Sequence, residues 1–216
     1  MKSLAELRGL RFPDDYVVKM FFKEGLQRAP GRALELGCGN GNNLLLFAAF
    51  GWQVTGVDYD DAALNDARYN LDGLGNWIRC DLAAHLPPLP ADGFDAILMP
   101  SVNYYIPRAA FINLLKYCGD ALRGGGKFYL RARLPEDWRF GRGQPEGPNA
   151  YRLACSETGE QGLLNVFYSE AELHQLLVAN LGELSGLQSL HVTADNPQSG
   201  IVVRNADLVI WGTRAP

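Results

Sequence analysis

The sequence of 216 residues is 47% hydrophobic and 20% charged, with a net charge of −4 and a pI near 5.4. This composition is ordinary for a globular protein and predicts one domain of the larger kind. The acidic balance argues against a general nucleic-acid binder, which needs a basic face to displace the counterions of phosphates.

Membrane, export and metal signals are not found in the sequence. The chain opens on Met1, Lys2 and Ser3 rather than on an apolar core, so we expect no signal peptide. The longest apolar run, Leu44 to Phe50, is too short for a membrane span. The cysteines are widely spaced with no C-x-x-C pair, which indicates neither a zinc site nor a disulfide framework. We therefore expect a cytoplasmic protein with reduced thiols and no metal.

Residues 1–30 are predicted to form an N-terminal helical cap. Leu4, Leu7 and Leu10 share a helical spacing, and residues 14–27 form a second amphipathic segment. Tyr16 in that segment has two interpretations, contact with a bound ligand or packing of the cap onto the core.

Strands and helices then alternate regularly. The predicted strands are 33–36, 53–59, 77–82, 94–99 and 127–134, and the predicted helices are 42–50, 61–70 and 107–122, the last ended by Gly124 to Gly126. Asp60 is a predicted helix N-cap, and Pro107 suits a first helical turn. This alternation predicts an α/β fold with a doubly wound, mostly parallel sheet and helices on both faces.

The last third of the chain departs from this pattern. Glycines and prolines make long regular elements unfavourable over 135–168, whereas its arginines and aromatic residues argue against disorder. We interpret 135–168 as an insertion that forms one wall of a substrate pocket. A capping box at Ser169 opens a helix over 170–181. Residues 186–194 and 205–213 are predicted as two further strands, joined by a turn at 196–200.

The glycine-rich stretch from Glu35 to Asn43 indicates a ligand-binding turn. Gly37, Gly39 and Gly41 follow a predicted strand, and glycine lets a ligand approach the backbone closely. Asn42 stands where the dinucleotide fingerprint needs its last glycine, and no GK[ST] follows, which excludes a P-loop. Asp58 ends the next strand, where a carboxylate accepts hydrogen bonds from ribose hydroxyls. Glu35 would be unfavourable beside a pyrophosphate and favourable beside a cation.

The pattern Glu35-x-Gly37-x-Gly39-x-Gly41, followed by Asp58, resembles motif I and the acidic motif of class I S-adenosylmethionine-dependent methyltransferases. The resemblance covers residues 30–134 and 169–214. It implies one methyltransferase domain over 1–216, with a Rossmann-like sheet of seven strands closed by an antiparallel C-terminal hairpin. Residues 138–143 and 158–160 resemble bacterial small-molecule methyltransferases of the domain 25 and 11 types, some of which modify surface sugars or metabolites.

The resemblance also implies a set of cofactor-binding residues. Glu35 would hold the ammonium end of S-adenosylmethionine, Asp58 the ribose, and Asp81 with Leu82 the adenine edge. A plainer interpretation of Asp81 is a turn or cap residue. The full set implied for S-adenosylmethionine, or its product S-adenosylhomocysteine, is Glu35, Gly37, Cys38, Gly39, Gly41, Asn43, Asp58, Tyr59, Asp81, Leu82, Pro100 and Ser101.

The sequence identifies no catalytic residue. Tyr104, Asp137 and Arg142 are candidates, and Tyr104 or Tyr105 could equally be core. His85, His174 and His191 could act as bases, although each has a structural interpretation. Arg131 and Arg133 share a strand face and, with Arg139, Arg142 and Arg152, could form a local anion site; exposed or ion-paired arginines are the alternative.

The predicted function is methyl transfer to an oxygen or nitrogen atom of a small molecule by in-line displacement. One alternative is a catalytically silent, cofactor-binding regulatory or partner subunit of the same fold. A nicotinamide dehydrogenase is disfavoured by Asn42 and Glu35. The expected partner is a small-molecule substrate rather than nucleic acid or a membrane, and the sequence leaves the oligomeric state open.

Overall fold

The computed structural model describes residues 2–89 and 91–215. Within them, seven strands form one sheet in the order β3-β2-β1-β4-β5-β10-β9, and three form a smaller sheet in the order β6-β7-β8. The strands are β1 (Arg32–Leu36), β2 (Gln53–Asp58), β3 (Asn76–Arg79), β4 (Phe94–Met99), β5 (Leu122–Arg133), β6 (Gly143–Gly147), β7 (Ala150–Leu153), β8 (Leu164–Val166), β9 (Leu184–Gln198) and β10 (Ile201–Arg214).

The large sheet is the doubly wound, Rossmann-like arrangement that the sequence predicts. Strands β1 to β5 pair in parallel, whereas β10 is antiparallel to both β5 and β9. The central strand β4 is buried along nearly its whole length, as expected for a parallel strand with both faces covered. The carboxyl ends of β1 to β5 therefore meet at one edge of the sheet, where ligands bind in such folds.

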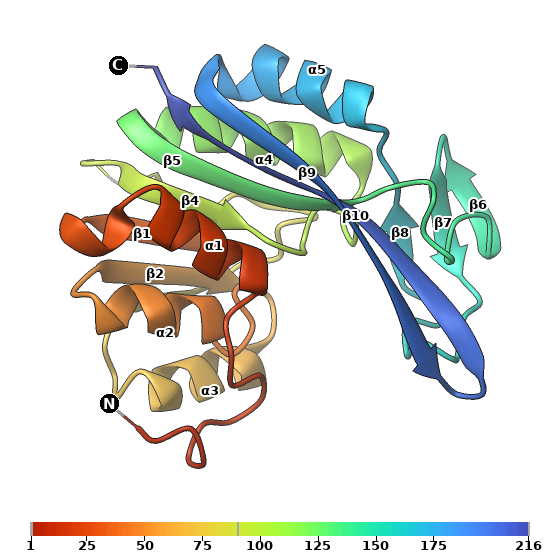
Figure 1. The fold of residues 1–216 in the computed structure, drawn as a ribbon, viewed down its shortest axis with the longest axis horizontal. Helices are drawn as coiled ribbons and strands as arrows, with labels where there is room; N and C mark the ends of the chain where they lie inside the picture. The colour runs from red at the N-terminus through yellow and green to blue at the C-terminus, as the bar shows by residue number, and fades with distance from the viewer. Residues whose placement is uncertain (1, 90, 216) are drawn as a thin grey trace.

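Helices cover both faces of this sheet (Figure 1). They are α1 (Asp15–Lys23), α2 (Asn42–Ala49), α3 (Asp61–Asn70), α4 (Arg108–Ala121) and α5 (Glu170–Leu181), with a short 3-10 helix η1 (Leu26–Arg28). One hydrophobic cluster joins α4 and α5 to the sheet, and a second joins α1, α2 and α3 to its other face. Asp60 caps α3 as predicted, because its carboxylate accepts from the Ala62 N–H at 2.8 Å.

The N-terminal segment corrects one expectation. Helical spacing of the leucines predicts a helix over 4–10, but residues 2–13 contain turns and no helix. Only Leu7 is buried, and Gly9 has a left-handed φ of 68° that interrupts helical backbone. The segment crosses the N-terminal end of α2 and the C-terminal end of α3, where the side-chain amides of Asn40, Asn42 and Asn70 bind its backbone. Only the second half of the predicted helical cap, α1, is helical.

Two further boundaries differ from the sequence prediction. The glycines Gly124 to Gly126 lie inside β5, which begins directly after α4. Opposite them the register of β4 and β5 shifts between Phe94 and Ala96, and Gly125 takes a φ of 78°. Strands β9 and β10 are longer than predicted, because their turn is only Ser199-Gly200, both with positive φ, as a two-residue hairpin turn requires.

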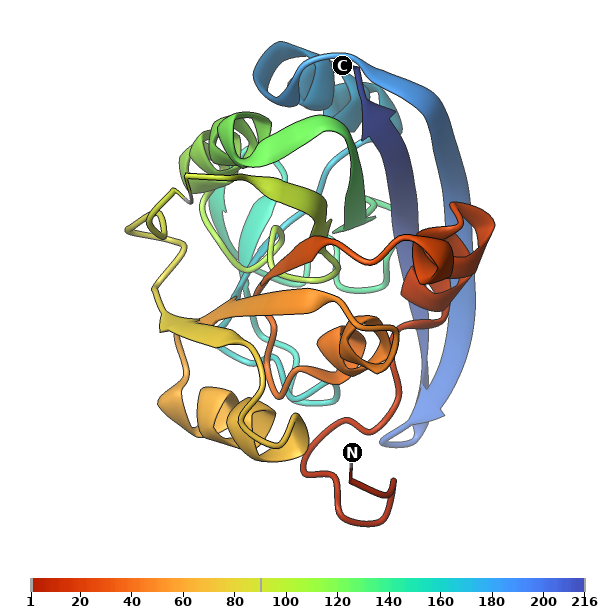
Figure 2. The ribbon, with the colours of Figure 1, turned by 90° about the vertical axis from the view of Figure 1, so that its left-hand side faces the viewer.

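Residues 135–168 contain three short antiparallel strands, β6, β7 and β8, joined by turns and irregular segments. This small sheet lies beside the extended β9–β10 hairpin, at the end of the molecule away from α2 and α3 (Figures 1 and 2). The prediction that long regular elements are unfavourable here fits the strands of three to five residues that form.

Candidate functional site

The glycine-rich turn connects β1 to α2 with a backbone that only glycine adopts easily. Gly37, Gly39 and Gly41 have φ values of 74°, 52° and 76°, in the left-handed region. A Cβ atom on Gly37 would lie 2.7 Å from the Cβ of Val102, so this turn is closely packed against the segment after β4. A Cβ on Gly39 would meet nothing within 4 Å. The turn therefore leaves open space beside Gly39 for a ligand.

A cavity of about 550 Å³ lies at the carboxyl ends of β1 to β4. It is lined by the predicted site residues Gly37, Gly39, Asp58, Tyr59, Asp81, Leu82 and Ser101, and also by Cys80, Ala83, Val102, Tyr105, Ile106, Leu163 and Leu164. The structure thus brings together residues from four strand ends and from the insertion. The predicted residues Glu35, Cys38, Gly41, Asn43 and Pro100 are not part of the lining.

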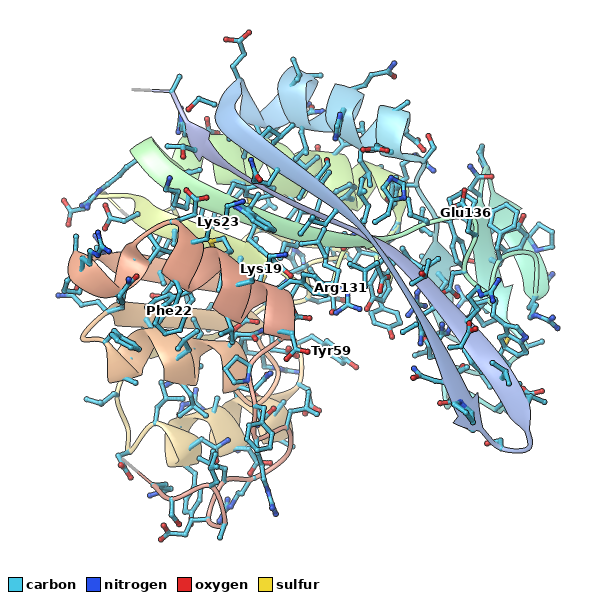
Figure 3. The ribbon with its side chains drawn as sticks, in the orientation of Figure 1. Lys19, Phe22, Lys23, Tyr59, Arg131 and Glu136 are labelled. Atoms are coloured by element: carbon cyan, nitrogen blue, oxygen red, sulfur yellow. The ribbon has the colours of Figure 1, made fainter. Side chains whose placement is uncertain are left out.

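Asp58 is held at the cavity by backbone donors. Its Oδ2 accepts from the Gly39 N–H at 2.8 Å, and its Oδ1 accepts from the Asp60 N–H at 3.0 Å. A carboxylate can accept more than two hydrogen bonds, so acceptor capacity remains for a ligand. Tyr59 follows it and points from the end of β2 into solvent with 71% of its surface exposed (Figure 3).

Asp81 makes a turn contact and also reaches the cavity. Its side chain accepts from the Ala83 N–H at 3.0 Å, which is the geometry of a turn residue. Asp81 and Leu82 also line the cavity. The turn interaction orients the carboxylate without removing it from the site.

Glu35 lies beneath the turn and is 1% exposed. Its Oε1 accepts from the Asn43 side-chain amide at 2.6 Å, whereas its buried Oε2 has no hydrogen-bond partner within the described residues. Burial is the main cause that raises the pKa of Glu35 to about 8. A cation bound above the turn would stabilise the ionised form. Asn43 is a positioning residue, since its Oδ1 also accepts from the Asp14 N–H at 2.8 Å.

The other predicted residues outside the lining act through the backbone or the core. The Cys38 side chain is buried in the hydrophobic cluster of α1 and α2, with its pKa raised by burial. Gly41 is the N-cap of α2. The Pro100 carbonyl accepts from the Ser101 hydroxyl at 2.6 Å. Tyr16 is half-buried against the same cluster and does not line the cavity, which favours its packing role.

The two tyrosines after β4 take different positions. Tyr104 is 8% exposed, its ring contacts that of Tyr105, and the Arg133 guanidinium lies 4.2 Å from its centroid. Tyr105 lines the cavity, and its hydroxyl donates to Glu160 Oε1 at 2.8 Å. The residue on the cavity surface is therefore Tyr105 rather than the candidate Tyr104.

The other catalytic candidates are held in the scaffold. Asp137 is 3% exposed and accepts from the Arg139 guanidinium at 3.0 Å and the Ala206 N–H at 3.1 Å. Arg142 donates to the Trp138 carbonyl at 2.7 Å and stacks on its ring. Neither side chain lines the cavity. The histidines His85, His174 and His191 also lie outside the lining.

The predicted cluster of arginines does not form an open anion site. Arg131 pairs with Asp14 and Asp207 at 2.6 Å each. Arg133 and Arg139 both pair with Glu160, and Arg152 with Glu146. Folding places a carboxylate opposite each of these four guanidiniums, as the alternative of ion-paired arginines predicts. The fifth arginine of the set, Arg142, donates to the Trp138 carbonyl instead.

Sequence reasoning missed the apolar part of the lining. Ile106 and Val102 follow β4, and Leu163 and Leu164 come from the insertion. The sequence signal for an insertion wall was present in 135–168, but no periodicity shows which of its residues faces a cavity.

A family model matches part of the chain. Residues 33–126 match the model of the methyltransferase domain family. The matched residues include the glycine-rich turn and Asp58, which resemble the motifs of class I S-adenosylmethionine-dependent methyltransferases. S-adenosylmethionine is the cofactor of that class. A search of curated proteins found no match.

Solved structures share the fold. A methyltransferase from Methanosarcina mazei is 19% identical with a TM-score of 0.70, and the match covers 90% of this chain and 97% of that one. One from Mesorhizobium loti is 20% identical with a TM-score of 0.60, covering 86% and 92%. The 1,6-didemethyltoxoflavin-N1-methyltransferase of Burkholderia thailandensis, solved with its substrate and S-adenosylhomocysteine, is 19% identical with a TM-score of 0.61, covering 93% and 76%. At these identities the likeness shows the fold.

Proposed function

We propose that this chain transfers the methyl group of S-adenosylmethionine to an oxygen or nitrogen atom of a small molecule. The observation that carries the proposal is the convergence of Gly39, Asp58 and Asp81 on one cavity. Gly39 leaves room for the ligand, and the two carboxylates suit the hydroxyls and exocyclic amine of adenosine. The family match and a structural neighbour that carries a small substrate support this assignment.

The residues present fit the cofactor in charge as well as in shape. None of the described residues that line the cavity is cationic. Glu35 has an unpartnered, buried oxygen below the turn, and an ammonium or sulfonium group would compensate its charge. A dinucleotide would instead bring two phosphates close to this carboxylate, which disfavours a dehydrogenase.

The cofactor supplies an electrophilic methyl group on a sulfonium. Because charge is dispersed during the transfer, no oxyanion needs stabilising, and the chain contributes mainly by orientation. Holding two reactants in line can lower a barrier by about 7–11 kcal/mol. Asp58 and the turn would fix the nucleoside, Ser101 and Tyr105 lie on the post-β4 segment beside it, and residues 163–164 would bound the acceptor.

Ligand binding gives the first test. We expect S-adenosylhomocysteine at one hundred times its Kd to stabilise the protein by about 2.7 kcal/mol, which raises Tm by about 5–10 °C for a chain of this size. NAD at the same concentration should leave Tm unchanged. A shift with NAD alone would overturn the assignment.

A second candidate is the catalytically silent subunit of the same fold, because none of the three catalytic candidates lines the cavity. Release of labelled methyl product with a panel of acceptors separates the two. Binding of S-adenosylhomocysteine without transfer to any acceptor would favour the silent subunit.

A further inference from the structure

The part of the cavity that does not belong to the predicted nucleoside contacts is apolar. Val102, Tyr105 and Ile106 contribute from the segment after β4, and Leu163 and Leu164 contribute from the insertion. Leu163 is 46% exposed and Tyr105 is 38% exposed. Apolar side chains are thus accessible at the site itself, and a ligand that covered them would gain from removing their surface from water.

None of the described residues that line this part of the cavity is positively charged. Arginines lie close behind this wall, but Arg133 donates to Glu160 at 2.9 Å and Arg139 donates to the same carboxylate. Arg131 is held between Asp14 and Asp207. An anionic acceptor would meet the carboxylates Asp58 and Asp81 in the lining without a compensating cation.

Glu160 and Tyr105, the titratable groups behind and on this wall, are poor proton acceptors. Burial acts to raise the pKa of Glu160, but Arg133 and Arg139 outweigh it and hold that pKa below its ordinary value. Burial, and then neighbouring Tyr104 and Glu160, raise the pKa of Tyr105, so its hydroxyl stays protonated and donates to Glu160. Neither group is suited to remove a proton from an alcohol.

We propose that the acceptor is an uncharged, largely apolar molecule whose nucleophile is a nitrogen with a free lone pair, as in an unprotonated aromatic heterocycle. This proposal rests on the proposed function. The nitrogen lone pair forms the new N–C bond while the C–S bond breaks and its electron pair returns to sulfur. The positive charge passes from sulfur to the methylated ring, and any ring N–H proton is lost afterwards to water. The apolar wall supplies contact area, and no base of the protein is required.

Three matched probes test this acceptor class. Benzimidazole is a neutral heterocycle, benzimidazole-5-carboxylate adds a negative charge to the same ring, and benzyl alcohol offers a hydroxyl on an apolar ring. Binding is measured by calorimetry on protein saturated with S-adenosylhomocysteine, and transfer is measured with labelled S-adenosylmethionine. We expect benzimidazole to bind at least about tenfold more tightly than its carboxylate and to be methylated at least about tenfold faster than benzyl alcohol.

The outcomes separate this inference from the proposed function. If the protein does not bind S-adenosylhomocysteine, both the proposed function and the acceptor class are contradicted. If it binds S-adenosylhomocysteine but does not bind benzimidazole, or prefers the carboxylate or the alcohol, only the acceptor class is contradicted.

A specificity exchange tests the wall directly. Leu163→Lys places a cation at the apolar wall, whereas Leu74→Lys places one on a leucine that is 63% exposed and does not line the cavity. We expect Leu163→Lys to shift the affinity ratio of benzimidazole-5-carboxylate to benzimidazole at least about tenfold toward the carboxylate. Leu74→Lys should leave the ratio unchanged, and both variants should bind S-adenosylhomocysteine as the parent does. An unaltered ratio in Leu163→Lys would show that this wall does not contact the acceptor.

Discussion

Two carboxylates near the glycine-rich turn occupy opposite environments. Glu35 is buried beneath the turn with one oxygen unpartnered, and burial raises its pKa to about 8. Asp58 reaches the cavity and accepts from two backbone N–H groups. Burial therefore favours the protonated form of Glu35, and a nearby cation would favour its ionised form. Asp58 retains acceptor capacity at the cavity.

Replacing Asp58 should weaken binding of the nucleoside. Asp58→Ala removes the proposed acceptor for the ribose hydroxyls, and hydrogen bonds to charged groups contribute about 1.5–3 kcal/mol each. We expect the Kd for S-adenosylhomocysteine to rise at least about tenfold, as measured by calorimetry. Asp66→Ala on the exposed side of α3 is the control, and circular dichroism checks that the turn still folds. An unchanged Kd would contradict the ribose assignment.

Replacing Glu35 should change how stability depends on pH. Because the folded-state pKa of about 8 lies above the ordinary value of 4.5, the folded chain keeps a proton that the unfolded chain releases. The free energy of unfolding therefore falls as pH rises from about 4.5 to 8 and is level above that interval. Glu35→Gln removes this component while its amide oxygen can still accept from Asn43.

We expect the stability of Glu35→Gln, relative to the parent, to increase between about pH 5 and pH 8 in urea titrations. Glu136→Gln makes the same chemical change at an exposed position (Figure 3) and should run parallel to the parent. Affinity for S-adenosylmethionine should fall in Glu35→Gln, since a neutral amide no longer attracts its cation. Parallel stability curves for Glu35→Gln and the parent would contradict the burial of a titrating group.

At the scale of elements, the N-terminal segment is fastened to the cofactor turn by side-chain amides. Asn40 donates to the carbonyls of Arg8 and Leu10 at 2.6 and 2.7 Å, and Asn42 donates to the Phe12 carbonyl at 2.9 Å. These backbone groups have no helix or sheet of their own, so the amides satisfy them. The segment therefore depends on the same turn that forms the cavity.

Asp14 connects this segment to the sheet. It caps α1 by accepting from the Tyr16 N–H at 2.8 Å, and it pairs with Arg131 of β5 at 2.6 Å. Figure 3 shows Arg131 near the start of α1. Losing a helix cap costs about 1 kcal/mol, and removing one partner of a partly buried ion pair adds to that cost.

We expect Asp14→Ala to lower the free energy of unfolding by about 2–3 kcal/mol and to speed proteolysis before α1. Asp15→Ala, which alters the exposed neighbour, is the matched control and should differ from the parent by about 0.5 kcal/mol or less. Equal unfolding curves for the two variants would show that Asp14 does not anchor the segment.

At the scale of the whole molecule, two hydrophobic clusters share one sheet. Leu34 and Leu36 of β1 belong to the cluster under α4 and α5, whereas Ala33 of the same strand belongs to the cluster under α1 and α2. Strands β4, β5 and β10 are divided in the same way. Neither cluster can lose its packing without disturbing strands that support the other.

We therefore expect residues 1–216 to unfold in one cooperative transition. Far-ultraviolet circular dichroism should report the helices, and near-ultraviolet signals from Trp52 and Trp211 should report the cluster of α1 and α2. The two probes should give the same midpoint in urea. Separate midpoints would show that the two faces of the sheet are independent.

No helix among residues 2–89 and 91–215 is long and apolar enough to cross a membrane.

The insertion is joined to the large sheet by a buried ion pair. Arg133 of β5 pairs with Glu160, which lies in the loop between β7 and β8.

The glycine-rich turn and the helix caps could be predicted from the sequence. The glycines at 37, 39 and 41 permit the left-handed backbone of the turn, and Asp60 and Ser169 cap their helices by contacts within three residues. Alternation of strands and helices then leaves few sheet orders, and the predicted antiparallel hairpin is confirmed. The prediction of a helix over 4–10 was wrong because contacts with a residue distant in sequence hold the backbone there. Leu4 and Leu10 have helical spacing, but the Asn40 amide donates to the carbonyls of Arg8 and Leu10.

The sequence by itself thus determined the fold and the edge of the sheet where the cavity lies, because these depend on periodicity and on short motifs. Only the tertiary structure decided which arginines are neutralised, that Tyr105 rather than Tyr104 lines the cavity, and that Leu163 and Leu164 form its apolar wall. Those outcomes depend on contacts between residues far apart in the chain, such as Arg133 with Glu160. The pairing of such residues is fixed only when the sheet and the insertion pack together.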